Sequence, residues 1–208
     1  MNRRIIGYYN YTVVLTYLGM ISAVIGIFFA TSGYYASAVW CLMVAGVCDM
    51  FDGAVASTMK RDEYQKKFGI QIDSLCDLIG FGVLPGLFCY LISKKTILAG
   101  IAAVMIILAA VIRLAYFNVL EEHRQKTETG NRKMFLGVPV TTISLLLPIV
   151  YLLSHNHIIP GAIAYPFVTA VTAIGFLTPV DIPKVQKTGK IVMLLLGIFE
   201  AAAMLLFG

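Results

Sequence analysis

Four aspartates stand in two segments of the chain that are otherwise apolar enough to lie in a membrane. Asp49 and Asp52 belong to the first segment, and Asp73 and Asp77 belong to the second. An ionisable side chain at membrane depth costs at least ~2.5–3.5 kcal/mol, so four of them need a compensating partner. Oxygen-only clusters select hard cations such as Mg²⁺, Mn²⁺ or Ca²⁺. The sequence therefore predicts a divalent-metal site built from these four aspartates.

The spacing of the aspartates predicts that all four converge. Asp49 and Asp52 are three residues apart, and Asp73 and Asp77 are four apart, so each pair shares one face of a helix. We expect a short polar loop over residues 58–68 to join the two helices, which makes them neighbours in space. Two cations about 3.5–4 Å apart could then clamp a phosphate and stabilise its attacking and leaving oxygens.

Two other interpretations start from the same residues. Acidic side chains within a membrane also form proton or cation pathways in transporters, and composition alone leaves a transporter and an enzyme open. The aspartates could instead pair with Arg113 and with loop lysines. A single arginine at membrane depth cannot neutralise four acids, so this explanation is the weaker one.

The elements that must hold these side chains are apolar helices. The chain has 208 residues, of which 59% are hydrophobic and 13% charged, whereas soluble domains average about 25% charged residues. We predict an all-α integral membrane protein, a polytopic bundle of about 6–8 and most simply seven transmembrane helices, forming one catalytic domain over residues 1–208. The seven apolar stretches cover residues 11–30, 35–57, 70–92, 96–118, 137–154, 159–179 and 190–207.

The basic residues predict the orientation of the bundle. With seven crossings and a cytoplasmic amino terminus, thirteen of the sixteen Lys and Arg residues lie inside, Lys94 and Lys95 lie outside, and Arg113 lies within a helix. This bias follows the positive-inside rule. We expect a multi-pass protein of the cytoplasmic membrane with its active site facing the cytoplasm. Its net charge of +5 then meets anionic lipid headgroups, and no nucleic-acid partner is expected.

The aspartates belong to a longer pattern, D-x-x-D-G-x-x-A followed by G-x-x-x-D-x-x-x-D. This pattern resembles the signature of the CDP-alcohol phosphatidyltransferase family. The resemblance implies a membrane enzyme that transfers a phosphatidyl group from a CDP-linked lipid to an alcohol, releases CMP and uses two Mg²⁺ or Mn²⁺ ions. It favours the enzyme over the transporter. The residues that carry it are Asp49, Asp52, Gly53, Ala56, Gly69, Asp73 and Asp77.

The resemblance also implies a role for each position. Asp49, Asp52 and Asp73 would bind the metal pair, while Asp77 would complete the site and take the proton from the attacking hydroxyl. The family usually has an arginine directly after the alanine of the motif, where this chain has Ser57; Lys60 could substitute for it, with Arg61 as a second candidate. The residues expected to bind the nucleotide or the lipid diphosphate are Gly53, Ala56, Ser57, Lys60, Gly69, Arg132 and Lys133.

Further motifs resemble the bacterial and archaeal phosphatidylserine synthases of this family. They are Ile72-Asp73-Ser74 with Phe81-Gly82-Val83, Arg113-Leu114 with Phe117-Asn118, and Phe135 to Pro139. The implied substrates are CDP-diacylglycerol and L-serine, and the implied assembly is a homodimer. A guanidinium group such as that of Arg113 would grip the carboxylate of serine, with Asn118 and Pro139 as further acceptor-binding candidates. Glycerol 3-phosphate, inositol phosphate and choline stay open as other acceptors.

Overall fold

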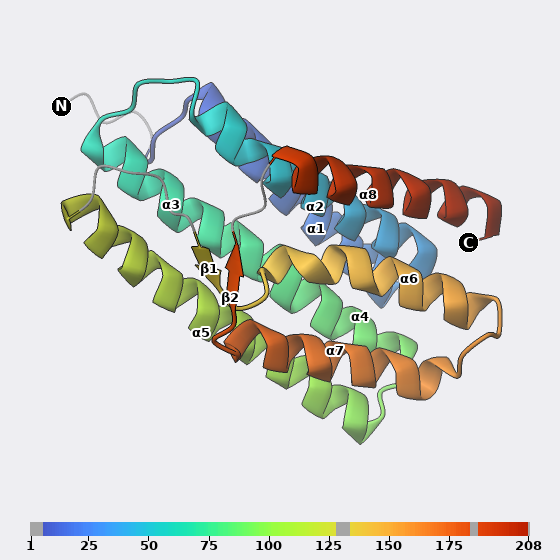
Figure 1. Cartoon of the computed structure of the whole chain (residues 1–208). Helices are drawn as coiled ribbons and strands as arrows, with labels where there is room; N and C mark the ends of the chain where they lie inside the picture. The colour runs from blue at the N-terminus through green and yellow to red at the C-terminus, as the bar shows by residue number, and fades with distance from the viewer. Residues whose placement is uncertain (1–5, 128–133, 184–186, 208) are drawn as a thin grey trace.

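The protein is a bundle of long helices. A computed structural model describes residues 6–127, 134–183 and 187–207 (Figure 1). Single 3₁₀ turns, Tyr11–Val13 and Val140–Thr142, lead into α1 and α6. The helices are α1 (Val14–Thr31), α2 (Tyr35–Ala56), α3 (Glu63–Asp77), α4 (Leu84–Ile92), α5 (Ile97–Thr127), α6 (Ile143–His155), α7 (Gly161–Leu177) and α8 (Lys187–Phe207).

The helices confirm the predicted multi-pass membrane protein. Because α3 continues through a π-helical segment into α4, the two count as one span. Within the described residues, four apolar helical segments are long enough to cross a bilayer, and three shorter ones match the last three apolar stretches of the sequence. The long spans are Tyr11–Thr31, Tyr35–Ala56, Glu63–Ile92 and Ile97–His123, and the shorter ones are Val140–His155, Gly161–Leu177 and Val192–Phe207.

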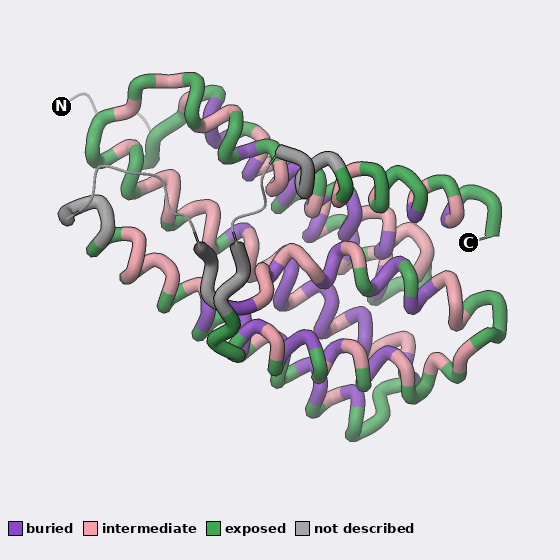
Figure 2. The backbone as a smooth tube through the Cα atoms, in the orientation of Figure 1, coloured by how far each residue is buried: buried purple, intermediate pink, exposed green. Residues whose placement is uncertain are grey.

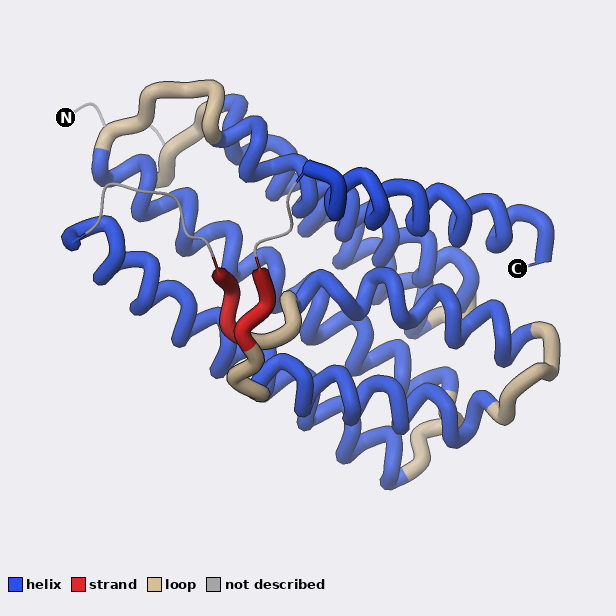
Figure 3. Tube along the Cα trace, in the orientation of Figure 1, coloured by secondary structure: helices blue, strands red, loops and turns tan. Residues whose placement is uncertain are grey.

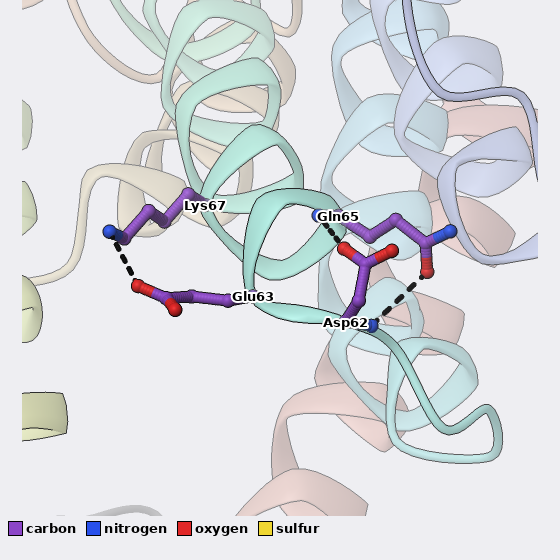
Figure 4. Close-up of polar contacts among 4 residues, drawn as sticks. All are labelled: Asp62, Glu63, Gln65 and Lys67. Atoms are coloured by element: carbon purple, nitrogen blue, oxygen red, sulfur yellow. Dashed lines mark hydrogen bonds and ion pairs between the residues drawn. The ribbon is translucent and has the colours of Figure 1, made fainter. Parts of the chain in front are cut away.

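The third span begins earlier than the sequence pattern indicates. We expected a loop as far as Phe68, whereas α3 starts at Glu63. A capping box fixes this start: the Asp62 side chain accepts a hydrogen bond from the Gln65 backbone N–H at 2.8 Å, and the Gln65 side chain accepts one from the Asp62 N–H (Figure 4). The first turns of α3 are polar and lie outside the apolar run, so hydrophobicity alone does not indicate that they are helical.

A π-helical segment, Leu78–Val83, follows directly after Asp77 and joins α3 to α4. Pro85 stands at the start of α4, and proline cannot donate the hydrogen bond that a regular turn requires. Single π-helical turns inside α-helices are frequent at functional sites. Here the wider turn lies next to one of the four aspartates.

The core of the bundle uses small residues where helices meet. A Cβ atom added at Gly26 of α1 would lie 2.9 Å from the Cys41 Cβ of α2 and 3.0 Å from a Leu84 methyl carbon of α4. Phe81, Leu84 and Phe88 are fully buried in the core. Buried residues concentrate in the middle of the bundle, whereas α8 is mostly exposed at one edge (Figure 2). Close backbone approach at small residues is typical of membrane helix packing.

A small β-ribbon, not predicted from the sequence, ties two connectors together. Strand β1 (Met134–Leu136) pairs antiparallel with β2 (Asp181–Pro183), so the α5–α6 connector meets the α7–α8 connector (Figure 3). Directly after β1, Gly137 has a φ of +72°, which favours glycine. Its N–H donates to the Val180 carbonyl at 2.7 Å. This ribbon and the α2–α3 loop lie at the same end of the bundle (Figure 1).

Candidate active site

The structure brings the four aspartates together between α2 and α3. Ligand oxygens of Asp49, Asp52 and Asp73 lie within 4.8 Å of one another. Asp77 lines a small cavity together with Asp49 and Asp52. Asp52 is buried and accepts a hydrogen bond from the Thr16 hydroxyl at 3.2 Å. Two antiparallel helices thus place their acidic faces against each other.

This acidic cluster could bind a metal ion. Four carboxylates at such separations repel one another, and a cation between them offsets that repulsion. The donors are all oxygen atoms, which suits a hard divalent cation. A cavity of about 10 Å³ between Asp49, Asp52 and Asp77 is about the space that one water molecule needs. The residues present therefore fit a small hard cation.

A second cavity, of about 210 Å³, adjoins the cluster through Asp52 and Asp73. Gly53, Ala56 and Gly69 line it, as expected for the three small residues of the sequence pattern. A Cβ at Gly53 would meet no atom within 4 Å, so this backbone borders open space. A Cβ at Gly69 would lie 2.9 Å from Nη1 of Arg61, so a small residue there leaves room for the guanidinium group.

The basic side chain in this cavity is Arg61 rather than Lys60. Arg61 lines the wall, whereas Lys60 is exposed and is not among the lining residues. Ser57 is exposed, and its hydroxyl donates to the Ala54 carbonyl at 2.6 Å. The sequence favours Lys60 as the substitute for the usual arginine, because Lys60 lies one helical turn beyond Ser57 if the helix continues. However, α2 ends at Ala56, so helical spacing does not apply to Lys60.

Two threonines of the site were not predicted. Thr12 and Thr16 line the 210 Å³ cavity and are buried. They are four residues apart at the start of the first apolar segment, so they share a helical face. That spacing of two small polar residues is the signal that could have indicated them. Arg132 and Lys133, predicted to hold the lipid diphosphate, lie outside the described residues.

Arg113 makes two hydrogen bonds to backbone carbonyl groups. It is buried, and its guanidinium group donates to the Phe176 carbonyl at 3.0 Å and the Gly137 carbonyl at 3.3 Å. It also lies 4.6 Å from the centre of the Phe117 ring. In the part of the chain that the structure describes, Arg113 lines neither cavity next to the aspartates. Its contacts anchor the connector that leads into α6.

The other two acceptor-binding candidates lie nearer the cluster. The Asn118 side chain accepts a hydrogen bond from the hydroxyl of Ser74, the neighbour of Asp73, at 2.8 Å. It donates to the Gln71 side chain at 3.4 Å. Pro139 lines a cavity of about 500 Å³ between α2, α6 and α8, and this cavity also reaches Asp49. Asn118 and Pro139 therefore approach the cluster from α5 and from the connector before α6.

Comparison with known proteins identifies the family. A family model described as CDP-alcohol phosphatidyltransferase matches residues 9–180. The chain belongs to the CDP-alcohol phosphatidyltransferase family. The matched region contains the acidic cluster and the cavity with Gly53, Gly69 and Arg61, and it ends before α8. The family resemblance expected from the sequence is confirmed.

Several individual proteins are similar to this phosphatidyltransferase-family chain. A CDP-diacylglycerol–serine O-phosphatidyltransferase from Helicobacter pylori is 32% identical over 165 residues, which cover 77% of this chain and 64% of that protein. One from Saccharomyces cerevisiae is 35% identical over 112 residues, covering 52% and 40%. An archaetidylserine synthase from Methanothermobacter thermautotrophicus is 27% identical over 179 residues, covering 84% and 70%. The chain thus spans somewhat less than two thirds of the length of the Helicobacter relative.

Proposed function

We propose that this protein transfers the phosphatidyl group of CDP-diacylglycerol to the hydroxyl of L-serine, giving phosphatidylserine and CMP. The observation that carries the proposal is the convergence of four aspartates beside a cavity lined by Gly53, Gly69 and Arg61. A metal cluster next to a small basic cavity suits a nucleoside diphosphate held by its phosphates. The names of the Helicobacter and yeast relatives support serine as the acceptor.

Asp49, Asp52 and Asp73 are the proposed ligands of two Mg²⁺ or Mn²⁺ ions, with Asp77 completing the site. When bound, such ions neutralise phosphate charge and stabilise the oxygens of the attacking and leaving groups. The protein contributes an arrangement of carboxylates from two helices that both pack against α1. Such preorganisation supplies a large part of the catalysis in phosphoryl transfer.

Other side chains bind the substrate and transfer the proton. The cavity with Gly53, Ala56 and Gly69 receives the cytidine side of the substrate, and Arg61 faces its phosphates. Asp77 takes the proton from the serine hydroxyl, whose oxygen forms a bond to the lipid-side phosphorus. The bond from that phosphorus to the bridging oxygen breaks, and CMP leaves with this oxygen. Phosphatidylserine stays in the membrane.

We propose that Asn118, Pro139 and Arg113 lie on the side of the site that binds the acceptor. Asn118 contacts Ser74, the neighbour of Asp73, and Pro139 lines the cavity that reaches Asp49. Both positions could therefore border a small acceptor. Arg113 would act on the acceptor by fixing the connector that carries Pro139, or by direct contact with the serine carboxylate. A raised KM for serine in an Arg113→Ala variant would support either role.

The test is CMP release by the purified full-length chain in lipid nanodiscs. We expect release with CDP-diacylglycerol and L-serine in the presence of Mg²⁺ or Mn²⁺, and a return to background with excess chelator. Glycerol 3-phosphate, an inositol phosphate and choline are the competing acceptors in the same assay. Turnover that survives chelation would exclude the metal mechanism, and a preference for another acceptor would replace serine.

An ion-coupled transporter is the second candidate, because acids within a membrane also serve that function. It predicts cation or proton flux in liposomes without CMP release, so the two assays separate the candidates.

We further propose that residues 1–208 form one catalytic domain, that the chain assembles as a homodimer, and that its acidic cluster faces the cytoplasm.

A further inference from the structure

A fifth buried acid lies outside the acidic cluster. Glu200 of α8 has only 4% of its surface exposed, and its Oε2 atom has no hydrogen-bond partner among the described residues. A buried polar atom without a partner costs on the order of 1–3 kcal/mol. The family model ends at residue 180, so neither the shared pattern nor the proposed chemistry accounts for an acid at this position.

Glu200 lines the cavity of about 500 Å³ between α2, α6 and α8, a volume within the roughly 300–1,000 Å³ range of ligand sites. The other lining residues are largely apolar, including Trp40, Leu145 and Leu194. Val44 is also part of the wall and is 48% exposed. The cavity can therefore be reached from the outer, lipid-facing surface of the bundle.

The shape of the cavity is that of a slot. Its wall runs along α2 from Trp40 to Met50, about 15 Å at the helical rise per residue. Because α8 runs opposite to α2 (Figure 1), Met193 lies at the end near Asp49. Glu200 follows seven residues later, roughly 10 Å further from the acidic cluster. An apolar slot that reaches Asp49 and runs along the helices fits a hydrocarbon chain attached to a bound phosphate.

A carboxyl group in apolar surroundings is least costly in its neutral form, which carries one O–H donor. The glycerol esters of a diacylglycerol lie a few bonds from its phosphate and present carbonyl acceptors. A dialkyl ether lipid lacks these carbonyls.

We propose that Glu200 determines the lipid specificity of the site by donating a hydrogen bond to a glycerol-ester carbonyl of the substrate, whose acyl chain occupies the α2–α6–α8 slot. This inference rests on the proposed function for the identity of the lipid. It assigns a substrate contact to α8.

The test compares CDP-dioleoylglycerol with its dialkyl ether analogue in one protein preparation. The ratio of kcat/KM for the two lipids does not depend on the fraction of folded protein. We expect the wild type to favour the ester by roughly 3–10-fold, the range of one hydrogen bond. Glu200→Gln keeps the size and a donor and should keep this preference. Glu200→Leu removes the donor and should bring the ratio close to one.

A second measurement separates this inference from the proposed chemistry. The rise in unfolding temperature that each lipid produces should show the same ester preference in the wild type and its loss in Glu200→Leu, whether or not CMP is released. Preference in binding without turnover with any alcohol would contradict the proposed function and support the role of Glu200. An unchanged ester preference in Glu200→Leu, or a raised serine KM as its sole effect, would overturn the inference.

Discussion

At the scale of single residues, Asp77 differs from the other three aspartates. The mutual cluster of ligand oxygens within 4.8 Å contains Asp49, Asp52 and Asp73. Asp77 instead lines the small cavity beside Asp49 and Asp52 and directly precedes the π-helical segment. We therefore expect Asp77, at the border of the acidic cluster, to take up the proton, and the other three aspartates to bind cations.

The variant Asp77→Asn tests this division. The amide keeps the size of the side chain but cannot accept the hydroxyl proton, so we expect the rate of CMP release to fall by about 100-fold or more. Binding of CDP-diacylglycerol, followed by the rise in unfolding temperature, should change little. Near-normal turnover in this variant would remove Asp77 as the base.

Arg61 and Lys60 form a matched pair of basic residues. Arg61 lines the cavity with Gly53 and Gly69, and Lys60 is exposed outside it. Loss of a charged hydrogen-bond donor to phosphate should raise the KM for CDP-diacylglycerol by roughly 10-fold or more in Arg61→Ala. Lys60→Ala should stay within about twofold of the wild type, because exposed charges contribute little. Equal effects in the two variants would contradict the assignment of Arg61.

At the scale of elements, the site depends on how closely α1, α2 and α4 pack. The Thr16 hydroxyl of α1 reaches Asp52, and Gly26 on the same helix meets α2 and α4 without room for a side chain. The position of α1 therefore couples helix packing to the acidic cluster.

The variant Gly26→Ala should lower the unfolding temperature in detergent, because overpacking costs about 1–3 kcal/mol. Gly100→Ala is the control: its added Cβ would lie 3.6 Å from the Tyr90 ring, an ordinary contact. Alanine is favoured over glycine inside helices, so this control should be unchanged or slightly more stable. A Gly26→Ala protein as stable as the control would contradict the close packing.

At the scale of the whole molecule, the two ends of the bundle differ in charge. The α2–α3 loop with Arg61 and the first turns of α3 with Lys66 lie at one end, together with the acidic cluster, and the α4–α5 turn with Lys94 and Lys95 lies at the other (Figure 1). Basic residues are more abundant at the end with the cluster, which supports a cytoplasmic active site.

Cysteine labelling in intact cells tests this orientation. Lys95→Cys should react with a membrane-impermeant maleimide from outside, whereas Lys66→Cys should react only after the membrane is opened. Both positions are exposed, and the native cysteines are buried or half-buried, so background labelling should be low. The reverse pattern would place the active site on the outer face.

The sequence by itself determined the number of spans, the family and the convergence of the aspartates. The spans follow from apolar runs long enough for a bilayer, and the convergence follows from acids three or four residues apart on one helical face. The family was indicated by the resemblance of the whole motif to a known signature. The start of α3 was placed too late because the capping box from Asp62 to Gln65 is polar and lies outside the apolar run.

Only the tertiary structure decided which residues lie around the aspartates and line the adjoining cavities. The choice of Arg61 over Lys60, the contacts of Thr16 and Arg113, and the place of Glu200 in a cavity with Asp49 all join residues distant in sequence or depend on where a helix ends. Periodicity identifies the face of a helix on which a residue lies, but it does not identify the helix that packs against that face. That pairing is set by side-chain packing among all the helices.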